Sequence, residues 1–271
     1  MGIRDDIAGD WHASLAALAW HVEIGVDEVI SEAPVNRYDL PETTRTPAAV
    51  ATVAAAARAA PPPAPVQPQV DAVEAARVAA ARATSLPELR EIIAGFDLCD
   101  LKKGARNTVF ADGNPEAHVL ILGEAPGRDE DIEGRPFVGA AGQLLDRMFA
   151  AIGLSRGAAE PERAIYITNV LPWRPPGNRD PEPAEIAMMR PFVERHIALM
   201  NPRVIVVMGN TPLYALTGQK GVMRARGTWA SALDRPMLPM VHPAYLLRNP
   251  IAKREAWADL LSLQSRIRAK N

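Results

Sequence analysis

The sequence predicts an α/β fold, a three-layer α/β/α domain with a central, mostly parallel sheet, plus an N-terminal helical and disordered extension. Two observations carry this prediction. Over the last two thirds of the chain, short apolar runs of strand length alternate with longer stretches of helical period. The short runs are apolar at nearly every position, which is typical of strands buried on both faces by helical crossovers.

Four buried strands are expected at 119–122, 164–170, 203–208 and 237–241, and a short additional strand at Val109 and Phe110. Helices are expected at 70–83, 86–94, 143–152, 183–200, 211–216 and 251–268. Pro191 lies inside the helix at 183–200 and is expected to kink or split it, because proline lacks the N–H that the helix needs.

Three regions are expected along the chain. Residues 1–33 contain one amphipathic helix, with apolar residues recurring at helical spacing from Trp11 to Val29. Residues 34–85 are rich in Pro and Ala, which favours a linker that is largely disordered. Residues 86–271 form the folded domain.

Composition restricts the class of protein. The chain of 271 residues has one cysteine, Cys99, which excludes an internal disulfide framework and fits a reducing cytoplasm. It has no run of eighteen apolar residues and no basic-then-apolar leader, so neither a membrane partner nor export is expected. The segment 218–270 has ten basic and three acidic residues, which favours a polyanionic partner.

Polar side chains follow three of the predicted strands. Glu124 follows the first, Asn169 ends the second, and His242 follows the last. Because the carboxyl ends of parallel strands meet at one edge of the sheet, these three side chains are expected to converge on one pocket. The loop after the first strand also carries several carboxylates and one aromatic residue, Phe137. Alone, this loop is compatible with a metal, sugar, base or phosphate site, or with an acidic surface loop.

The residue types narrow the chemistry. No Cys/His spacing motif for a metal is present, no Ser or Cys lies at a strand-to-helix elbow, and no Walker A lysine occurs. An aromatic ring, an amide, a histidine and a carboxylate are instead suited to a planar heterocycle. The ring stacks, the amide pairs with the edge, the histidine donates to developing negative charge, and the carboxylate positions water or stabilises positive charge.

Three motifs point to a known family. GEAPGRDEDIEGRPFVGAAGQLLDRM (123–148), ITNVLPWRPPGNRDPEPAEI (167–186) and VHPAYLLRNP (241–250) resemble the uracil-DNA glycosylase superfamily, most closely the family-four bacterial enzymes. The resemblance extends from Phe96 to the C-terminus. It implies a monofunctional glycosylase that removes uracil from single- or double-stranded DNA and so initiates base excision repair. It also implies a monomer in the bacterial cytosol or nucleoid.

The resemblance assigns roles by position in the first two motifs. Glu124 and Glu130 match acidic catalytic residues, and Glu124 would position or polarise the attacking water. Phe137 matches the aromatic residue that stacks on the extruded uracil. Asn169 matches the amide that reads the uracil edge and excludes cytosine, and Asn178 matches a supporting uracil-binding amide.

The third motif supplies the remaining roles. His242 matches the histidine that hydrogen-bonds uracil O2 as the glycosidic bond breaks. The loop that follows resembles the element that enters the duplex, with Leu246, Leu247 or Arg248 as the plug that contacts DNA.

The chain departs from the family at the iron–sulfur cluster. The family usually binds a four-iron, four-sulfur cluster through four cysteines, and the corresponding positions here are Phe96, Cys99, Trp173 and Met189. One thiolate cannot hold such a cluster. We therefore expect no cofactor and no metal, with the three non-cysteine side chains forming a hydrophobic plug and Cys99 a buried structural thiol.

Two alternatives and one further partner remain open at this stage. The chain could be a catalytically silent DNA- or polymerase-binding module on the same fold, since related domains occur fused to phage polymerases. It could instead be a nucleotide-binding protein that uses the loop 123–127 for phosphate, although the carboxylates of this loop would repel phosphate. The extension 1–85 could dock a repair or replication partner.

Overall fold

The computed structural model describes residue 15 and residues 71–269. The chain divides into two units, Met1–Ala64 and Pro65–Asn271, and the fold below is that of the second unit. The helix expected in 1–33 and the linker up to residue 70 lie outside the described residues. No helix in the described part has the length and hydropathy needed to span a bilayer.

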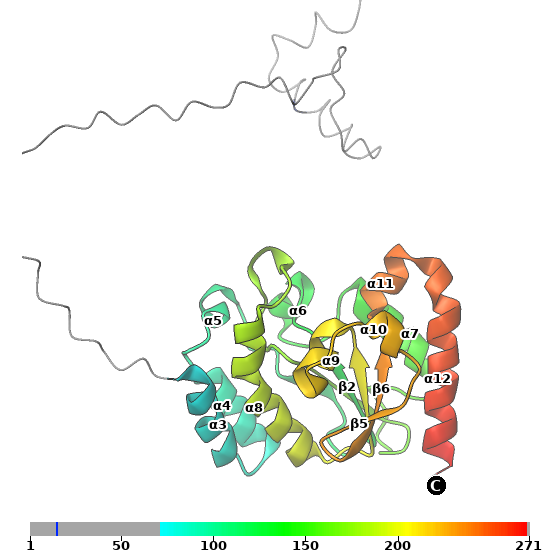
Figure 1. Ribbon diagram of the computed structural model, residues 1–271, viewed down its shortest axis with the longest axis horizontal. Helices are drawn as coiled ribbons and strands as arrows, with labels where there is room; N and C mark the ends of the chain where they lie inside the picture. The colour runs from blue at the N-terminus through cyan, green and yellow to red at the C-terminus, as the bar shows by residue number, and fades with distance from the viewer. Residues whose placement is uncertain (1–14, 16–70, 270–271) are drawn as a thin grey trace, which may run out of the picture. The chain divides into compact units, whose positions relative to one another are not determined.

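A six-stranded sheet forms the centre of this unit, in the order β1-β3-β2-β4-β6-β5 (Figure 1). The four inner strands are parallel, and both edge strands pair antiparallel, so the predicted α/β class with a mostly parallel sheet is confirmed. The strands are β1 (Ala111–Gly113), β2 (Val119–Gly123), β3 (Ile165–Asn169), β4 (Val204–Met208), β5 (Ala230–Ala232) and β6 (Arg235–Met240).

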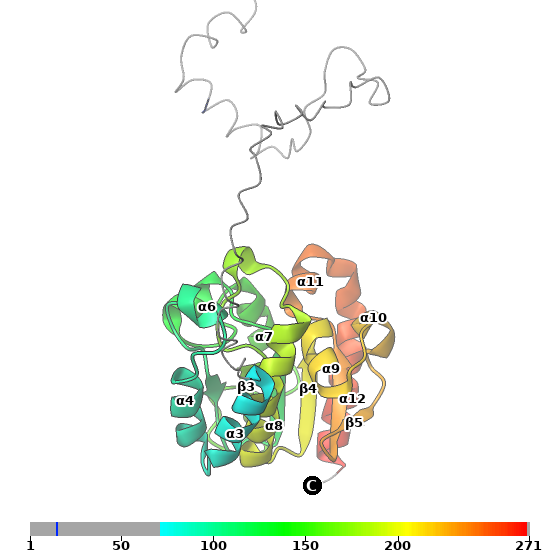
Figure 2. The same ribbon diagram turned by 60° about the vertical axis from the view of Figure 1, so that its left-hand side comes forward.

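Helices cover both faces of the sheet (Figures 1 and 2). Successive side chains of a strand point to opposite faces, so β2 contributes Leu120 and Leu122 to one core and Val119 and Ile121 to the other. The helices that pack in the first core are α3 (Ala72–Arg82), α4 (Leu86–Ala94), α8 (Pro183–Met200) and α9 (Asn210–Thr217). The second core is closed by α7 (Ala140–Ala150) and α12 (Lys253–Arg268).

Shorter elements lie in the connections between these strands and helices. They are α5 (Leu101–Gly104), α6 (Arg128–Glu133), the 3₁₀ turn η1 (Pro176–Asn178), α10 (Val222–Ala225), α11 (Pro243–Arg248) and the 3₁₀ turn η2 (Pro250–Ala252).

The folded domain begins earlier than expected. Helix α3 lies inside the range 34–85 that was predicted to be a linker, yet Ala76, Ala80 and Ala83 are buried in the same core as α8. Arg195 of α8 also donates two hydrogen bonds to the Ala83 carbonyl. The described end of the predicted linker, residues 71–85, is therefore part of the domain, because small alanine side chains let α3 approach α8 closely.

Two smaller expectations differ from the structure. Pro191 was expected to kink or split its helix, and α8 is not split there but continues to Met200, with Met189, Phe192 and Val193 on either side buried in the core. The residues Val109 and Phe110 form no strand, since the Val109 N–H donates to the Pro172 carbonyl and the edge strand starts at Ala111.

A charged side chain introduced into the α3–α8 interface tests whether α3 belongs to the folded domain. Ala76→Glu buries a carboxylate without a partner, and we expect the free energy of unfolding to fall by roughly 3 kcal/mol. Ala81→Glu is the matched control on the exposed side of the same helix, and it should change stability little. Urea unfolding of both variants gives the comparison, and equal small effects would contradict the assignment of α3 to the domain.

Candidate active site

The carboxyl edge of the sheet contains a cavity of about 460 Å³. Seven of the residues predicted from sequence line it together: Glu124, Glu130, Phe137, Asn169, Asn178, His242 and Arg248. The convergence of three strand ends on one pocket is thus seen directly in the structure.

The pairing of β2 with β3 places the first two groups side by side. Gly123 is the register partner of Asn169, and the ladder continues past the strand ends through hydrogen bonds from Val170 N to Gly123 O and from Leu171 N to Glu124 O. A side chain at position 123 would overlap both the Asn169 amide oxygen and the Phe137 ring. Glycine is therefore needed here for close approach rather than for its backbone conformation.

Asn169 presents an unused hydrogen-bond acceptor. The residue is only 7% exposed, and its Oδ1 has no hydrogen-bond partner within the protein. Buried polar atoms are nearly always paired, so an unpaired one on a residue that lines a cavity is a candidate position for a ligand to supply the donor. A planar molecule with an N–H on its edge fits this requirement.

His242 and Phe137 form the aromatic part of the pocket. Their ring centroids lie 5.3 Å apart with the planes 29° from parallel. The His242 Nδ1 accepts a hydrogen bond of 3.2 Å from the Ala244 N–H at the start of α11. Burial lowers the pKa of His242 to about 4, so the ring is neutral at pH 7 and carries its proton on Nε2. The ring is therefore a hydrogen-bond donor through Nε2.

Glu124 is held by a residue that the sequence did not point to. The Thr211 hydroxyl, in the first turn of α9, donates to Glu124 Oε2 at 2.5 Å. Burial raises the pKa of Glu124, the hydrogen bond from Thr211 opposes this shift, and the nearby Asp180 charge adds to it. Thr211 could have been predicted from the sequence, because it also follows a parallel strand, β4, at the same edge of the sheet.

Glu130 is engaged in holding its own loop. Its Oε1 accepts the backbone N–H groups of Val138 and Gly139, each at 2.9 Å, and its Oε2 accepts that of Gly127 at 3.1 Å. With both oxygens engaged by the backbone, the carboxylate is suited to fixing the shape of the pocket rather than to activating water. The catalytic role predicted for Glu130 is thus not the one that this geometry favours.

Asn178 lines the pocket from the turn η1. Its Oδ1 accepts a hydrogen bond of 2.7 Å from Arg174 Nε, which fixes the orientation of the amide. The neighbouring Arg179 pairs with Glu185 at the start of α8, so this loop is tied to the helix that follows it.

One of the residues that were predicted to contact DNA is buried. Leu246 is 1% exposed and packs in a small core with Leu144 and Val241, so the prediction that it enters a duplex is wrong. It lies on the inner side of the short helix α11, where the sequence alone could not separate it from its neighbours. Leu247 is 41% exposed, and Arg248 is exposed at the rim of the cavity.

The four positions that correspond to cluster ligands lie together in the first core. Phe96, Cys99, Trp173 and Met189 are all buried there, and Phe96 packs edge-to-face on Phe192. A phenyl ring, an indole, a thioether and one thiol do not supply four thiolates, so these residues do not fit an iron–sulfur cluster. Burial also raises the pKa of the Cys99 thiol, which disfavours the thiolate that binds metal.

Among residues 71–269, no group of three or more His, Cys, Asp or Glu side chains is arranged to hold a metal ion. The chemistry available in the pocket is thus that of a neutral imidazole donor, an amide, an aromatic face and a hydrogen-bonded carboxylate.

Comparison with known proteins agrees with this geometry. A model of the uracil DNA glycosylase superfamily matches residues 110–261. The type-4 uracil-DNA glycosylase of Archaeoglobus fulgidus is 37% identical over 186 residues, which cover 65% of this chain and 89% of that protein. The type-4 enzyme of Thermotoga maritima is 39% identical over 154 residues, 56% of this chain and 77% of that protein. A DNA polymerase of Bacillus phage SP01 is 28% identical over 176 residues, only 18% of its length.

The protonation state of His242 is open to direct measurement. We expect the neutral Nε2–H tautomer at pH 6, because burial disfavours the imidazolium and the Ala244 N–H occupies Nδ1. Nitrogen-15 NMR of the histidine rings reports the tautomer, and His242→Asn assigns the signal. A titration midpoint above pH 6 would contradict the inferred state.

Removal of the Thr211 hydroxyl should act on Glu124. Thr211→Val keeps the side-chain shape but deletes the hydrogen bond that stabilises the carboxylate, so the pKa of Glu124 should rise further. At a given pH near this pKa, a larger fraction of the carboxyl is then protonated. Carbon-13 NMR titration of the glutamate side chains measures the shift. Thr217→Val, in the same helix but bonded to the Leu213 carbonyl, is the control, and an equal shift in both variants would refute the assignment.

Proposed function

The chain belongs to the uracil DNA glycosylase superfamily, and we propose that this monofunctional DNA glycosylase flips uracil out of DNA and hydrolyses its N-glycosidic bond, initiating base excision repair. The observation that carries the proposal is the buried, unpaired Oδ1 of Asn169, which lies in one pocket with Phe137 and His242.

The unpaired oxygen supports recognition of uracil over cytosine. Uracil presents an N3–H donor beside the O4 acceptor, and cytosine presents an N3 acceptor beside an amino donor. The Asn169 amide offers an acceptor and a donor side by side, so it complements uracil, whereas cytosine would leave buried groups unpaired. Since the pocket lies in the protein, the base must leave the stack to reach it.

The neutral imidazole supports the proposed bond cleavage. As the bond between the sugar and the base breaks, its electron pair moves onto uracil and negative charge grows at O2. His242, with its proton on Nε2, donates a hydrogen bond to that oxygen as the charge develops. Water attacks the sugar carbon C1′, and Glu124 positions this water or stabilises the cationic sugar. Phe137 stacks on the base and Asn178 supports its binding.

The rim of the pocket supplies the contacts to DNA. We assign Leu247 and Arg248 as the residues that enter or contact the strand, because both are exposed and Arg248 lines the cavity. The substrate is uracil-containing DNA, single- or double-stranded. The protein acts as a monomer in the bacterial cytosol or nucleoid, and the part of the expected extension that precedes residue 71 is available to a repair or replication partner.

The proposed activity needs no resident cofactor. The four positions that the family resemblance matches to cluster ligands are the buried Phe96, Cys99, Trp173 and Met189, which supports a hydrophobic plug with Cys99 as a structural thiol. None of the four lines the pocket itself.

One observation favours a second function. The match to part of a phage DNA polymerase allows this fold to serve as a silent DNA- or polymerase-binding module. The retention of an unpaired amide oxygen beside a neutral histidine favours the enzyme instead, because a module without activity has no use for either.

An excision assay tests the proposed function. Purified wild-type protein should produce abasic sites, seen as strand cleavage after alkali, in a labelled oligonucleotide with one uracil. Asn169→Ala should lower the rate at least about 100-fold, because the base loses its edge contacts. Gln264→Ala removes an amide that bonds the Ile152 carbonyl outside the pocket, and it should keep nearly full activity.

The opposite outcome is equally clear. If wild-type protein leaves both single- and double-stranded uracil oligonucleotides intact, the uracil-excision proposal is refuted. Binding of the same oligonucleotides without cleavage would then favour the silent module.

A further inference from the structure

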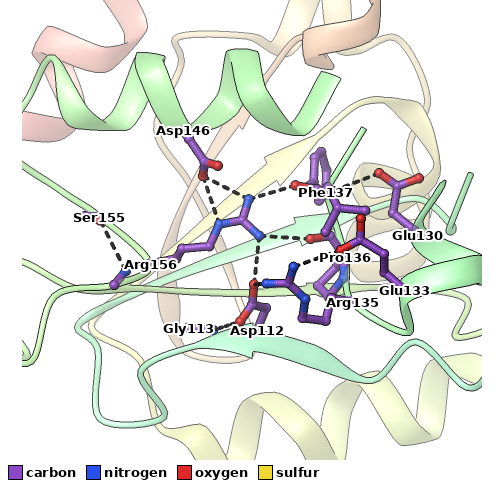
Figure 3. Close-up of polar contacts among 12 residues, drawn as sticks. Asp112, Gly113, Glu130, Glu133, Arg135, Pro136, Phe137, Asp146, Ser155 and Arg156 are labelled. Carbon is purple, nitrogen blue, oxygen red and sulfur yellow. Dashed lines mark hydrogen bonds and ion pairs between the residues drawn. The ribbon is translucent and has the colours of Figure 1, made fainter. Parts of the chain in front are cut away.

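We infer that Arg156 is a positioning residue for Phe137: its guanidinium holds the backbone turn that presents the aromatic ring to the base. This inference rests on the proposed function. Arg156 lies between α7 and β3 and was not singled out by any motif, yet its guanidinium makes four hydrogen bonds to the residues around the Phe137 turn (Figure 3).

The guanidinium contacts the turn at two consecutive carbonyl groups. Arg156 Nη1 donates to the Pro136 carbonyl at 3.0 Å, and Nη2 donates to the Phe137 carbonyl at 2.9 Å. These carbonyls belong to the two peptide groups on either side of the Phe137 Cα. The contact therefore acts on the backbone that aims the ring, not on the ring itself.

The turn is in a conformation that a bulky side chain avoids. Phe137 has φ of 54°, in the left-handed region that favours glycine. Such a conformation persists only when the surrounding structure enforces it. Here two oppositely charged side chains, one on each side of the turn, stabilise this backbone conformation. Arg156 binds the carbonyls of 136 and 137, and the Glu130 carboxylate accepts the N–H groups of 138 and 139.

Arg156 is itself fixed in place by two carboxylates. Nη1 donates to Asp112 Oδ2 of β1 at 2.9 Å, and Nε donates to Asp146 Oδ1 of α7 at 2.9 Å. Through Arg156, the turn is therefore connected both to the edge strand β1 and to helix α7. Figure 3 shows the guanidinium enclosed by these groups.

The same surroundings argue against a direct role in binding DNA. The Arg156 side chain is only 16% exposed, and two carboxylates balance its charge. An arginine that contacts phosphate needs an accessible, uncompensated guanidinium. Arg156 is therefore assigned to the shape of the base pocket and not to the DNA backbone.

A double-mutant cycle separates positioning of Phe137 from general stability. Arg156→Gln should lower kcat/KM on a single-stranded uracil oligonucleotide about 10- to 100-fold and weaken inhibition by free uracil, because the ring is no longer held over the base. In a Phe137→Ala background the same substitution should have little further effect, since the group that it positions is gone.

Arg226→Gln is the matched control. Arg226 has a similar exposed fraction, 18%, and pairs with the buried Asp259 away from the pocket. Its loss should lower the melting temperature but leave kcat/KM and uracil inhibition within about twofold of wild type. Should Arg156→Gln fail to fold, Asp146→Asn removes one of the two charges that hold Arg156, and it should give a smaller loss that also vanishes in the Phe137→Ala background.

The inference is overturned if the Arg156 substitution lowers kcat/KM equally in both backgrounds, or if it leaves kcat/KM and uracil inhibition unchanged in an active protein. Failure of the proposed function is a different result, because wild type itself would then release no uracil.

Discussion

The parallel pairing of β2 with β3 is the constraint on which the site depends. It sets Gly123 opposite Asn169, and two further backbone hydrogen bonds carry the pairing past the strand ends to Glu124. The main chain thus fixes the amide and the carboxylate before any side chain is considered. Because position 123 has no side chain, the Phe137 ring can close on the same point. Loss of this register would separate Glu124 from Asn169.

Burial then gives these groups their chemical character. The same apolar surroundings lower the pKa of His242 to about 4 and raise that of Glu124, so desolvation moves both groups toward neutrality. For the histidine, neutrality allows Nδ1 to accept from Ala244 while Nε2 carries a proton that can be donated. For the glutamate, the hydrogen bond from the Thr211 hydroxyl opposes part of the rise in pKa and so favours the charged carboxylate. The cavity therefore combines a neutral imidazole with a carboxyl group whose charge burial disfavours and Thr211 favours.

The sequence predicted the parts of the site that follow from local pattern. Glu124, Asn169 and His242 each follow an apolar strand, and the rule that parallel strands end at one edge brings them together. It did not predict Arg156 or the inward position of Leu246, since both depend on contacts between distant segments. The boundary of the domain was missed for a related reason. The alanines of α3 look like linker composition until the surface of α8 is known.

The opposed charges around the Phe137 turn determine how the pocket responds to ionic strength. Mobile ions screen exposed charges over about 8 Å at physiological ionic strength, and they compete with protein cations for DNA phosphates. The contacts of Arg156 and Glu130 to the turn are short, largely shielded from solvent and made to the backbone. Ionic strength therefore acts on the encounter with the strand but hardly on the shape of the base pocket. In the proposed glycosylase, affinity for DNA and selectivity for the base are therefore separately adjustable quantities.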